Sequence, residues 1–406
     1  MTTPAANTTP TLGAAERFAE EWADARRRAE RAAPASAPPR VRAGQLHDRF
    51  ALECGAVLLD VHQHFVLDGV VNAARDNVVL VLHALTGSAD AACPERGWWR
   101  DLIGPGRAID TRRHAVLAPN LLGSCYGTTG PSRPWTVAAG TWNRRGFPPV
   151  TTRDMARLVG RLVDALRLPS LAAVVGGSLG GMVAQEFLLE HPGRARSAVV
   201  LAAPDAHTAQ AIAWNHAQRE ALRLGAAAGD PDAGVALARR VAMIAFRTEQ
   251  ALERRFGRAA ADADPSTFAV RAWLDHHGAA LAARFDAATY RTLLDAMDTH
   301  DVGRGRGGRA EALRALGAAA EQVTAVGVPG DLLYSDDVVA AWAQVAAATY
   351  RAVRSPHGHD AFLLEPAQVG AILREALGRP ARPRTAADGV PASLGDRRRR
   401  ARRARA

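Results

Sequence analysis

The sequence predicts an α/β fold, in which helices flank a mostly parallel sheet and a helical lid is inserted between two late strands. Three observations predict it. Short apolar runs typical of buried strands alternate with segments whose apolar residues recur at helical spacing. One such run, at 171–175, leads through a glycine-rich turn into the helical pattern of 181–190. The stretch 205–321 is rich in Ala and Arg and carries only helical patterns.

The other elements follow in chain order. We expect strands at 57–67, 78–82 and 114–119, a crossover helix at 152–168, and further strands at 197–202, 322–328 and 348–353. The chain then divides into a disordered or helical non-catalytic extension at 1–45, the first part of the core at 46–204, the lid at 205–321, the second part of the core at 322–379, and a disordered Arg-rich tail at 380–406.

The glycine-rich turn is a nucleophile elbow, Gly176-Gly177-Ser178-Leu179-Gly180, which fits the pattern G-x-S-x-G between a strand and a helix. Glycines on either side leave room for a strained serine backbone, so the hydroxyl of Ser178 projects above the sheet. The N–H of Leu179 then lies at a helix N-terminus, where negative charge is favoured. Ser178 is therefore the predicted nucleophile, and Leu179 is a predicted oxyanion donor.

An acid and a histidine follow the serine in the order that such an elbow requires. Asp331 follows one predicted late strand, and His357 and His359 follow the next. Because the carboxyl ends of parallel strands meet at one edge of a sheet, we expect these side chains beside Ser178. Asp331 would fix the tautomer of a histidine that accepts the serine proton. The residues alone do not decide between His357 and His359, and a turn or helix cap is the simpler role for Asp331.

A second oxyanion donor is expected in the loop His83-Ala84-Leu85-Thr86-Gly87, which directly follows the predicted strand 78–82. In α/β-hydrolases this loop supplies the other N–H of the oxyanion hole, and Leu85 is the predicted donor. A plain strand-to-loop turn is the alternative. Together with the elbow, the acid and the histidine, this loop identifies the expected architecture as the α/β-hydrolase fold.

Further segments carry a closer resemblance. They lie at 83–87, 97–99, 102–106, 125–131, 151–155, 176–182, 254–258, 284–287, 296–298 and 358–363. In these segments the chain resembles the homoserine O-acetyltransferases of the α/β-hydrolase superfamily. The resemblance runs from about residue 50 to about residue 377 and covers nearly the whole expected folded part. It is much more specific than the elbow, which many esterases and lipases share.

The resemblance implies an O-acyltransferase that moves an acetyl group from its co-substrate acetyl-CoA, through an ester on Ser178, to the hydroxyl of L-homoserine in methionine biosynthesis. It implies that the histidine of Gly358-His359-Asp360 is catalytic and that Asp360 holds the ammonium group of the acceptor. The spacing Trp214-Asn215-x-x-x-Arg219 matches a family segment whose arginine pairs with the amino acid carboxylate, so Arg219 is the predicted contact. A solvated helix face is the alternative for Arg219. The family also implies a homodimer interface on the lid and no permanently bound cofactor.

Two departures from the family fall on the acceptor side. The segment 222–232 lacks the tyrosine pair that in the family usually follows the helix of the carboxylate-binding arginine. The segment 141–148 ends in Phe147-Pro148, but the residues before this pair differ from those usual in the family. They leave the ester chemistry intact and leave the substrates open. The alternatives are another acceptor such as serine or a secondary-metabolite alcohol, succinyl-CoA as donor, or an esterase that uses water.

Composition fits a cytoplasmic enzyme with small-molecule substrates. No stretch approaches the ~20 apolar residues of a membrane span, and no secretory signal is visible. The three cysteines are scattered and fit neither a disulfide framework nor a metal site. The net charge of +10 is concentrated in the Arg-rich tail, so we expect no nucleic-acid partner. The run Gly303-Arg304-Gly305-Arg306-Gly307-Gly308 follows no strand, and we expect a flexible lid turn there instead of a phosphate loop.

Overall fold

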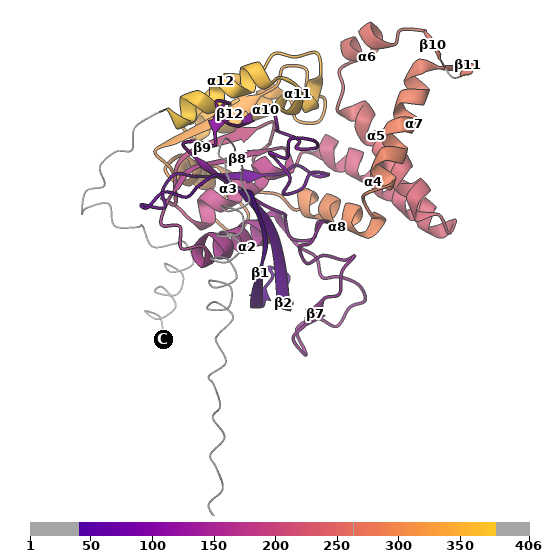
Figure 1. Cartoon of the computed structure of the whole chain (residues 1–406). Helices are drawn as coiled ribbons and strands as arrows, with labels where there is room; N and C mark the ends of the chain where they lie inside the picture. Colours follow the sequence, from indigo (N-terminus) through magenta and orange to yellow (C-terminus); the bar gives the residue numbers. More distant parts are fainter. Residues whose placement is uncertain (1–39, 263, 379–406) are drawn as a thin grey trace, which may run out of the picture.

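The computed structural model describes residues 40–262 and 264–378. Predictions for the extension before residue 40 and for the Arg-rich tail lie outside the described residues. Within them, a central sheet is flanked by helices, and a group of helices stands beside the sheet (Figure 1). The strand order is β1-β2-β6-β3-β8-β9-β12-β13, with β7 added against β2. All pairings from β6 to β13 are parallel, while β1, β2 and β7 pair antiparallel, so the predicted α/β fold is confirmed.

The strands of this sheet are β1 (Arg40–Ala51), β2 (Val57–Asp68), β3 (Val78–Leu82), β6 (Ala115–Pro119), β7 (Thr136–Val137), β8 (Leu171–Gly177), β9 (Ala195–Leu201), β12 (Gln322–Gly327) and β13 (Thr349–Ala352). A separate small pair is formed by β4 (Ile103–Gly104) and β5 (Ile109–Asp110). Strand β1 begins at Arg40, before the boundary at 45 that the sequence predicts. The sequence of β1 is polar and its apolar residues do not alternate regularly, so it did not predict a strand, although β1 pairs with β2 along its whole length.

Helices cover both faces of the sheet. They are α2 (Thr152–Ala165), α3 (Leu179–Glu190), α10 (Asp336–Val345), the short η1 (Gly358–Asp360), α11 (Ala361–Leu364) and α12 (Pro366–Leu377). Successive side chains of a strand point to opposite faces, and the core divides accordingly. Leu80 and Leu82 belong to one core cluster, which includes α2 and α3, whereas Val79 and Val81 belong to the other, which includes α12. Both faces of β3 are buried, which explains its uninterrupted apolar run.

The segment between β9 and β12 is mainly helical, with α4 (Ala209–Ala227), α5 (Pro231–Ala245), α6 (Glu249–Arg255), α7 (Ala269–Ala282), α8 (Ala287–Asp298) and α9 (Arg309–Gly317). Figure 1 shows α4 to α7 standing away from the sheet. Side chains of Thr208, Asp230, Thr248 and Asp286 accept backbone N–H bonds and so begin four of these helices. A short hairpin, β10 (Ala260–Ala261) and β11 (Asp264–Phe268), lies where the sequence predicts helix alone.

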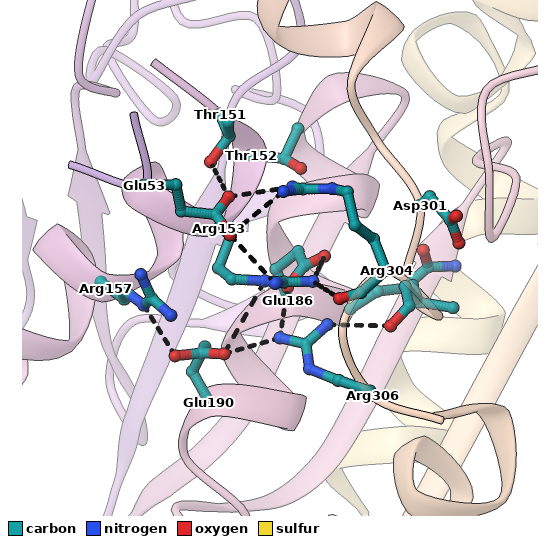
Figure 2. Close-up of polar contacts among 12 residues, drawn as sticks. Glu53, Thr151, Thr152, Arg153, Arg157, Glu186, Glu190, Asp301, Arg304 and Arg306 are labelled. Carbon is teal, nitrogen blue, oxygen red and sulfur yellow. Dashed lines mark hydrogen bonds and ion pairs between the residues drawn. The ribbon is translucent and has the colours of Figure 1, made fainter. Parts of the chain in front are cut away.

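A buried ion-pair network ties the elbow helix α3 to its neighbours (Figure 2). Glu186 of α3 has no exposed side-chain surface and lies 2.9 Å from the Arg153 guanidinium of α2 and 2.6 Å from that of Arg306. Arg306 also lies 2.6 Å from Glu190, and Arg153 lies 3.0 Å from Glu53 in the turn after β1. The expectation of a flexible turn at 303–308 is therefore wrong, because Arg306 is buried and paired from two sides.

No helix in the described ranges, 40–262 and 264–378, is long and apolar enough to cross a membrane.

Removing one member of this network is predicted to destabilise the protein. Arg306→Met should lower the free energy of unfolding by ~3 kcal/mol, because a buried carboxylate loses a partner. Arg157→Met is the matched control, since Arg157 pairs with the same Glu190 but is 38% exposed and should cost at most ~1 kcal/mol. Urea unfolding followed by circular dichroism measures both. Equal losses for the two variants would contradict a special role for the buried pairs.

Candidate active site

The elbow holds Ser178 in a strained backbone conformation between β8 and α3. Its φ is 55° and its ψ is −124°, in a region that non-glycine residues rarely adopt. A Cβ on Gly176 would lie 2.2 Å from the carbonyl oxygen of Gly180, and one on Gly180 would lie 2.1 Å from that of Leu82. The Ser178 N–H donates to the Leu201 carbonyl of β9 at 2.9 Å. Packing thus requires glycine at positions 176 and 180. The serine turn is held by contacts with the ends of β3, β8 and β9.

Ser178, His359 and Asp331 form one continuous chain of contacts. His359 Nε2 lies 2.9 Å from Ser178 Oγ, and its Nδ1 lies 2.7 Å from Asp331 Oδ2. The other Asp331 oxygen accepts the backbone N–H groups of Leu333 and Tyr334 at 2.8 and 3.0 Å. A carboxylate can only accept, so His359 carries its proton on Nδ1 and leaves Nε2 free to take the serine proton. The three residues are between 3% and 5% exposed.

The loop after β13 brings His359 to the serine and leaves His357 outside the contact chain. The His357 N–H donates to Ser355, and its carbonyl accepts from Arg247. Gly358 has a φ of 61°, and a Cβ there would lie 2.9 Å from the carbonyl oxygen of Phe246. Glycine therefore permits the turn that carries His359 under the lid.

Aromatic side chains surround the imidazole of His359. The rings of Phe246, Tyr334 and Phe362 have centroids 5.4, 5.2 and 5.8 Å from it. Burial by itself lowers the pKa of His359, but the Asp331 carboxylate outweighs burial and raises the pKa above its ordinary 6.5. The histidine can therefore hold a proton during a reaction without leaving its low-dielectric surroundings.

The loop after β3 is held by a neutral histidine. Burial lowers the pKa of His83 to about 4, its Nδ1–H donates to the Ala84 carbonyl at 2.8 Å, and its Nε2 accepts the Leu121 N–H at 3.0 Å. In the part of the chain that the structure describes, the N–H groups of Leu85 and Leu179 have no acceptor. Two unpaired donors at the edge of the elbow suit a developing oxyanion. Their catalytic role stays a prediction.

The two predicted acceptor contacts are each paired within the protein. The Arg219 guanidinium on α4 lies 2.6 Å from Asp298 and 3.4 Å from Asp295. Asp360 lies 3.0 Å from the guanidinium of Arg247. The structure does not bring Arg219 into contact with the Ser178, His359 and Asp331 side chains, whereas Asp360 is the chain neighbour of His359.

A residue that the sequence reasoning missed is Arg239 on α5. Its guanidinium lies 5.5 Å from the centroid of the Phe246 ring, which packs on His359. Among the described residues it has neither an ion pair nor a hydrogen bond. Burial lowers its pKa, an effect that Tyr290 and Asp360 oppose. A signal was present in the sequence, because Arg239 falls at helical spacing from the apolar residues Val235 and Ala242, and the structure leaves it half-buried on that lid helix.

Within the described residues no cluster of His, Cys, Asp and Glu side chains could hold a metal ion. The arrangement supports nucleophilic acyl chemistry with a serine, a histidine and an aspartate.

Comparisons with known proteins place this chain in a family. Residues 77–244 match a family model described as the alpha/beta hydrolase fold. The chain is 44% identical to the homoserine O-acetyltransferase of Thermus thermophilus over an alignment of 359 positions that covers 83% of this chain and 92% of the relative. A solved homoserine O-acetyltransferase from Bacillus anthracis has a TM-score of 0.75 at 22% identity, covering 84% of this chain and 99% of its own. A solved esterase, E22, has a TM-score of 0.72 at 21% identity, covering 83% and 100%.

The geometry predicts the pH dependence of Ser178 acylation. His359 must be neutral to accept the serine proton, so acylation should rise with pH and reach its half-maximum above pH 6.5, because Asp331 raises the pKa of His359. The burst of coloured product from a chromogenic acetyl ester measures this. Asp331→Asn should slow the burst by about 10³ to 10⁴-fold, while His357→Gln should keep the rate and the midpoint. A midpoint at or below 6.5 would refute the assignment.

Proposed function

The chain belongs to the homoserine O-acetyltransferase family of the α/β-hydrolase superfamily and is an O-acyltransferase; from this premise we propose that it moves an acetyl group from acetyl-CoA, through an ester on Ser178, to the hydroxyl of L-homoserine. The observation that carries the proposal is the contact chain Ser178–His359–Asp331 in a chain 44% identical to an enzyme of that name. Methionine biosynthesis, a cytoplasmic location and a homodimer formed through the lid belong to the same proposal.

In the first half-reaction the Ser178 oxygen attacks the thioester carbonyl while His359 Nε2 accepts the hydroxyl proton. The carbonyl oxygen becomes an oxyanion beside the N–H groups of Leu85 and Leu179. The C–S bond then breaks, and the proton on His359 passes to the departing thiolate of CoA. Asp331 stabilises the imidazolium between these two events.

In the second half-reaction the acceptor hydroxyl takes the place of CoA. His359 accepts its proton, the oxygen attacks the ester on Ser178, and the tetrahedral centre collapses with the proton returning to the serine oxygen. Water would complete the same cycle as an esterase, so the acceptor must be held while water is excluded. The aromatic rings around His359 and the low exposure of Ser178 support transfer over hydrolysis.

We assign the acceptor carboxylate to Arg239 ahead of Arg219. The guanidinium of Arg239, on lid helix α5, has no charged partner and would be stabilised by an anion, whereas the charge of Arg219 is already balanced by Asp298. A carboxylate on Arg239 would form a charge-assisted pair close to the ring that contacts His359. Asp360 would hold the acceptor ammonium group while keeping its ion pair to Arg247.

A panel of substrates tests the proposal. Acetyl-CoA with L-homoserine should give O-acetylhomoserine at the highest kcat/KM, above serine, other alcohols and water, and succinyl-CoA should be a poorer donor. Mass spectrometry of the product and thiol release measure this. Ser178→Ala should abolish thiol release. Release that ignores every added alcohol would establish an esterase instead.

A pair of arginine variants tests the acceptor site. Arg239→Met should raise the KM for homoserine about 30-fold, since a charge-assisted pair of roughly 2 kcal/mol is lost, while thiol release from acetyl-CoA in a single turnover should persist. Arg219→Met is the matched control on the neighbouring lid helix and should change this KM less than about threefold. The reverse pattern would return the carboxylate contact to Arg219.

A further inference from the structure

A cavity of about 530 Å³ lies beside the predicted oxyanion loop. The segment 86–90, which continues the loop after β3, forms one wall, and Arg42 of β1 and His64 of β2 form another. Arg284, in the short segment between α7 and α8, and Tyr126, in the loop after β6, complete it. Loops after β3 and β6 lie at the carboxyl edge of the parallel sheet, the same edge as Ser178.

The cavity carries an excess of positive charge. Three arginines line it, namely Arg42, Arg96 and Arg284, while Asp90 is the carboxylate among the lining residues. Arg40, Arg42 and Arg96 all pair with Asp90. Burial alone would raise the pKa of Asp90, but these arginines hold that pKa below its ordinary value. Arg40 also pairs with Asp68, but among the lining residues the single carboxylate of Asp90 faces three guanidinium groups, so the cavity favours an anion with several oxygens.

Aromatic rings accompany this charge. Trp98 and Tyr126 line the cavity, and Tyr126 is 36% exposed. The Trp98 indole is fixed in place, because its Nε1–H donates to the Ser88 carbonyl at 2.9 Å and its ring lies 5.0 Å from that of the buried Trp99. A fixed, partly open indole is a platform on which a planar base can stack.

Two contacts connect the cavity to the reacting groups. The Arg284 guanidinium donates to the Thr86 carbonyl at 2.9 Å, directly after Leu85. On the other side, Trp99 Nε1–H donates to the Phe362 carbonyl at 3.0 Å, and Phe362 packs on His359. The cavity is therefore built into the loops that carry the predicted oxyanion donor and the histidine.

We propose that this cavity binds the phosphorylated adenosine end of acyl-CoA, so that the arginines contact the phosphates and Trp98 stacks on the adenine. The inference rests on the proposed function and gives the donor a place separate from that of the acceptor at Arg239. A small zwitterionic amino acid has one carboxylate and no planar base, so it would not bind to three arginines and an indole together. A nucleotide carrying several phosphates matches both features.

The test compares two donors that share a thioester and differ in the nucleotide. Arg96→Met and Trp98→Leu should each lower the ratio of kcat/KM for acetyl-CoA to kcat/KM for acetylpantetheine about tenfold, which corresponds to 1.4 kcal/mol of binding. Arg112→Met is the matched control, because Arg112 is an exposed arginine outside the cavity, paired with Asp110, and should leave the ratio unchanged. Urea midpoints close to that of the unaltered protein establish that the variants fold.

A binding experiment supplies the second arm. Adenosine 3′,5′-bisphosphate should bind the unaltered protein in calorimetry, bind more weakly as salt rises, and bind about tenfold more weakly to Arg96→Met. An unchanged donor ratio in both cavity variants, with acetyl-CoA still used by the unaltered protein, would overturn this site and leave the proposed function intact. Failure of the unaltered protein to release CoA from acetyl-CoA would overturn the proposed function itself.

Discussion

The close approach of α3 to the sheet at Gly180 is the constraint on which the rest of the site depends. A Cβ at this position would lie 2.1 Å from the Leu82 carbonyl oxygen, so the first turn of the helix rests directly on the end of β3. This contact places the N–H of Leu179 opposite the loop that begins at His83. The turn that leads into this contact has Ser178 at a positive φ, and the hydrogen bond from the Ser178 N–H to the Leu201 carbonyl holds it there. The serine and both predicted oxyanion donors are therefore positioned by one packing contact.

Charged side chains near the active site fall into two groups, those paired within the protein and one without a charged partner. At the C-terminal end of α3, Glu186 is buried with Arg153 and Arg306, and each charge has a partner at 2.9 Å or less. Such a cluster is closed, since no partner is left for a ligand, and its effect is to hold the helix and the 303–308 segment in place. Arg239 lies over the Phe246 ring that packs on His359, and its guanidinium has no such partner in the described part of the chain. A half-buried guanidinium without a charged partner is costly, and an anionic ligand would lower that cost.

The sequence could predict the parts of the site that depend on local pattern. Ser178, Asp331 and a histidine, either His357 or His359, each follow a strand-like run, and the common edge of a parallel sheet predicts that they meet. The choice of His359 came from the family resemblance. The roles of the arginines were harder to predict, because whether Arg219 or Arg239 is paired depends on residues far away in the chain. Arg306 was expected in a flexible turn for the same reason, since its partner Glu186 lies on another element. The strand at Arg40 was hidden because its pairing with β2, not its own pattern, defines it.

On the proposed function, the choice between transfer and hydrolysis is made by the lid and not by the triad. The contact chain of Ser178, His359 and Asp331 would serve water as well as an alcohol. The lid surface that faces His359 can distinguish an alcohol from water. There the Phe246 ring lies 5.4 Å from the imidazole, between centroids, and beneath Arg239. A carboxylate bound at Arg239 would sit over this ring and displace water from the side from which the acceptor hydroxyl must approach. Acceptor binding and water exclusion would then be one event, and a lid residue would determine which oxygen receives the acyl group.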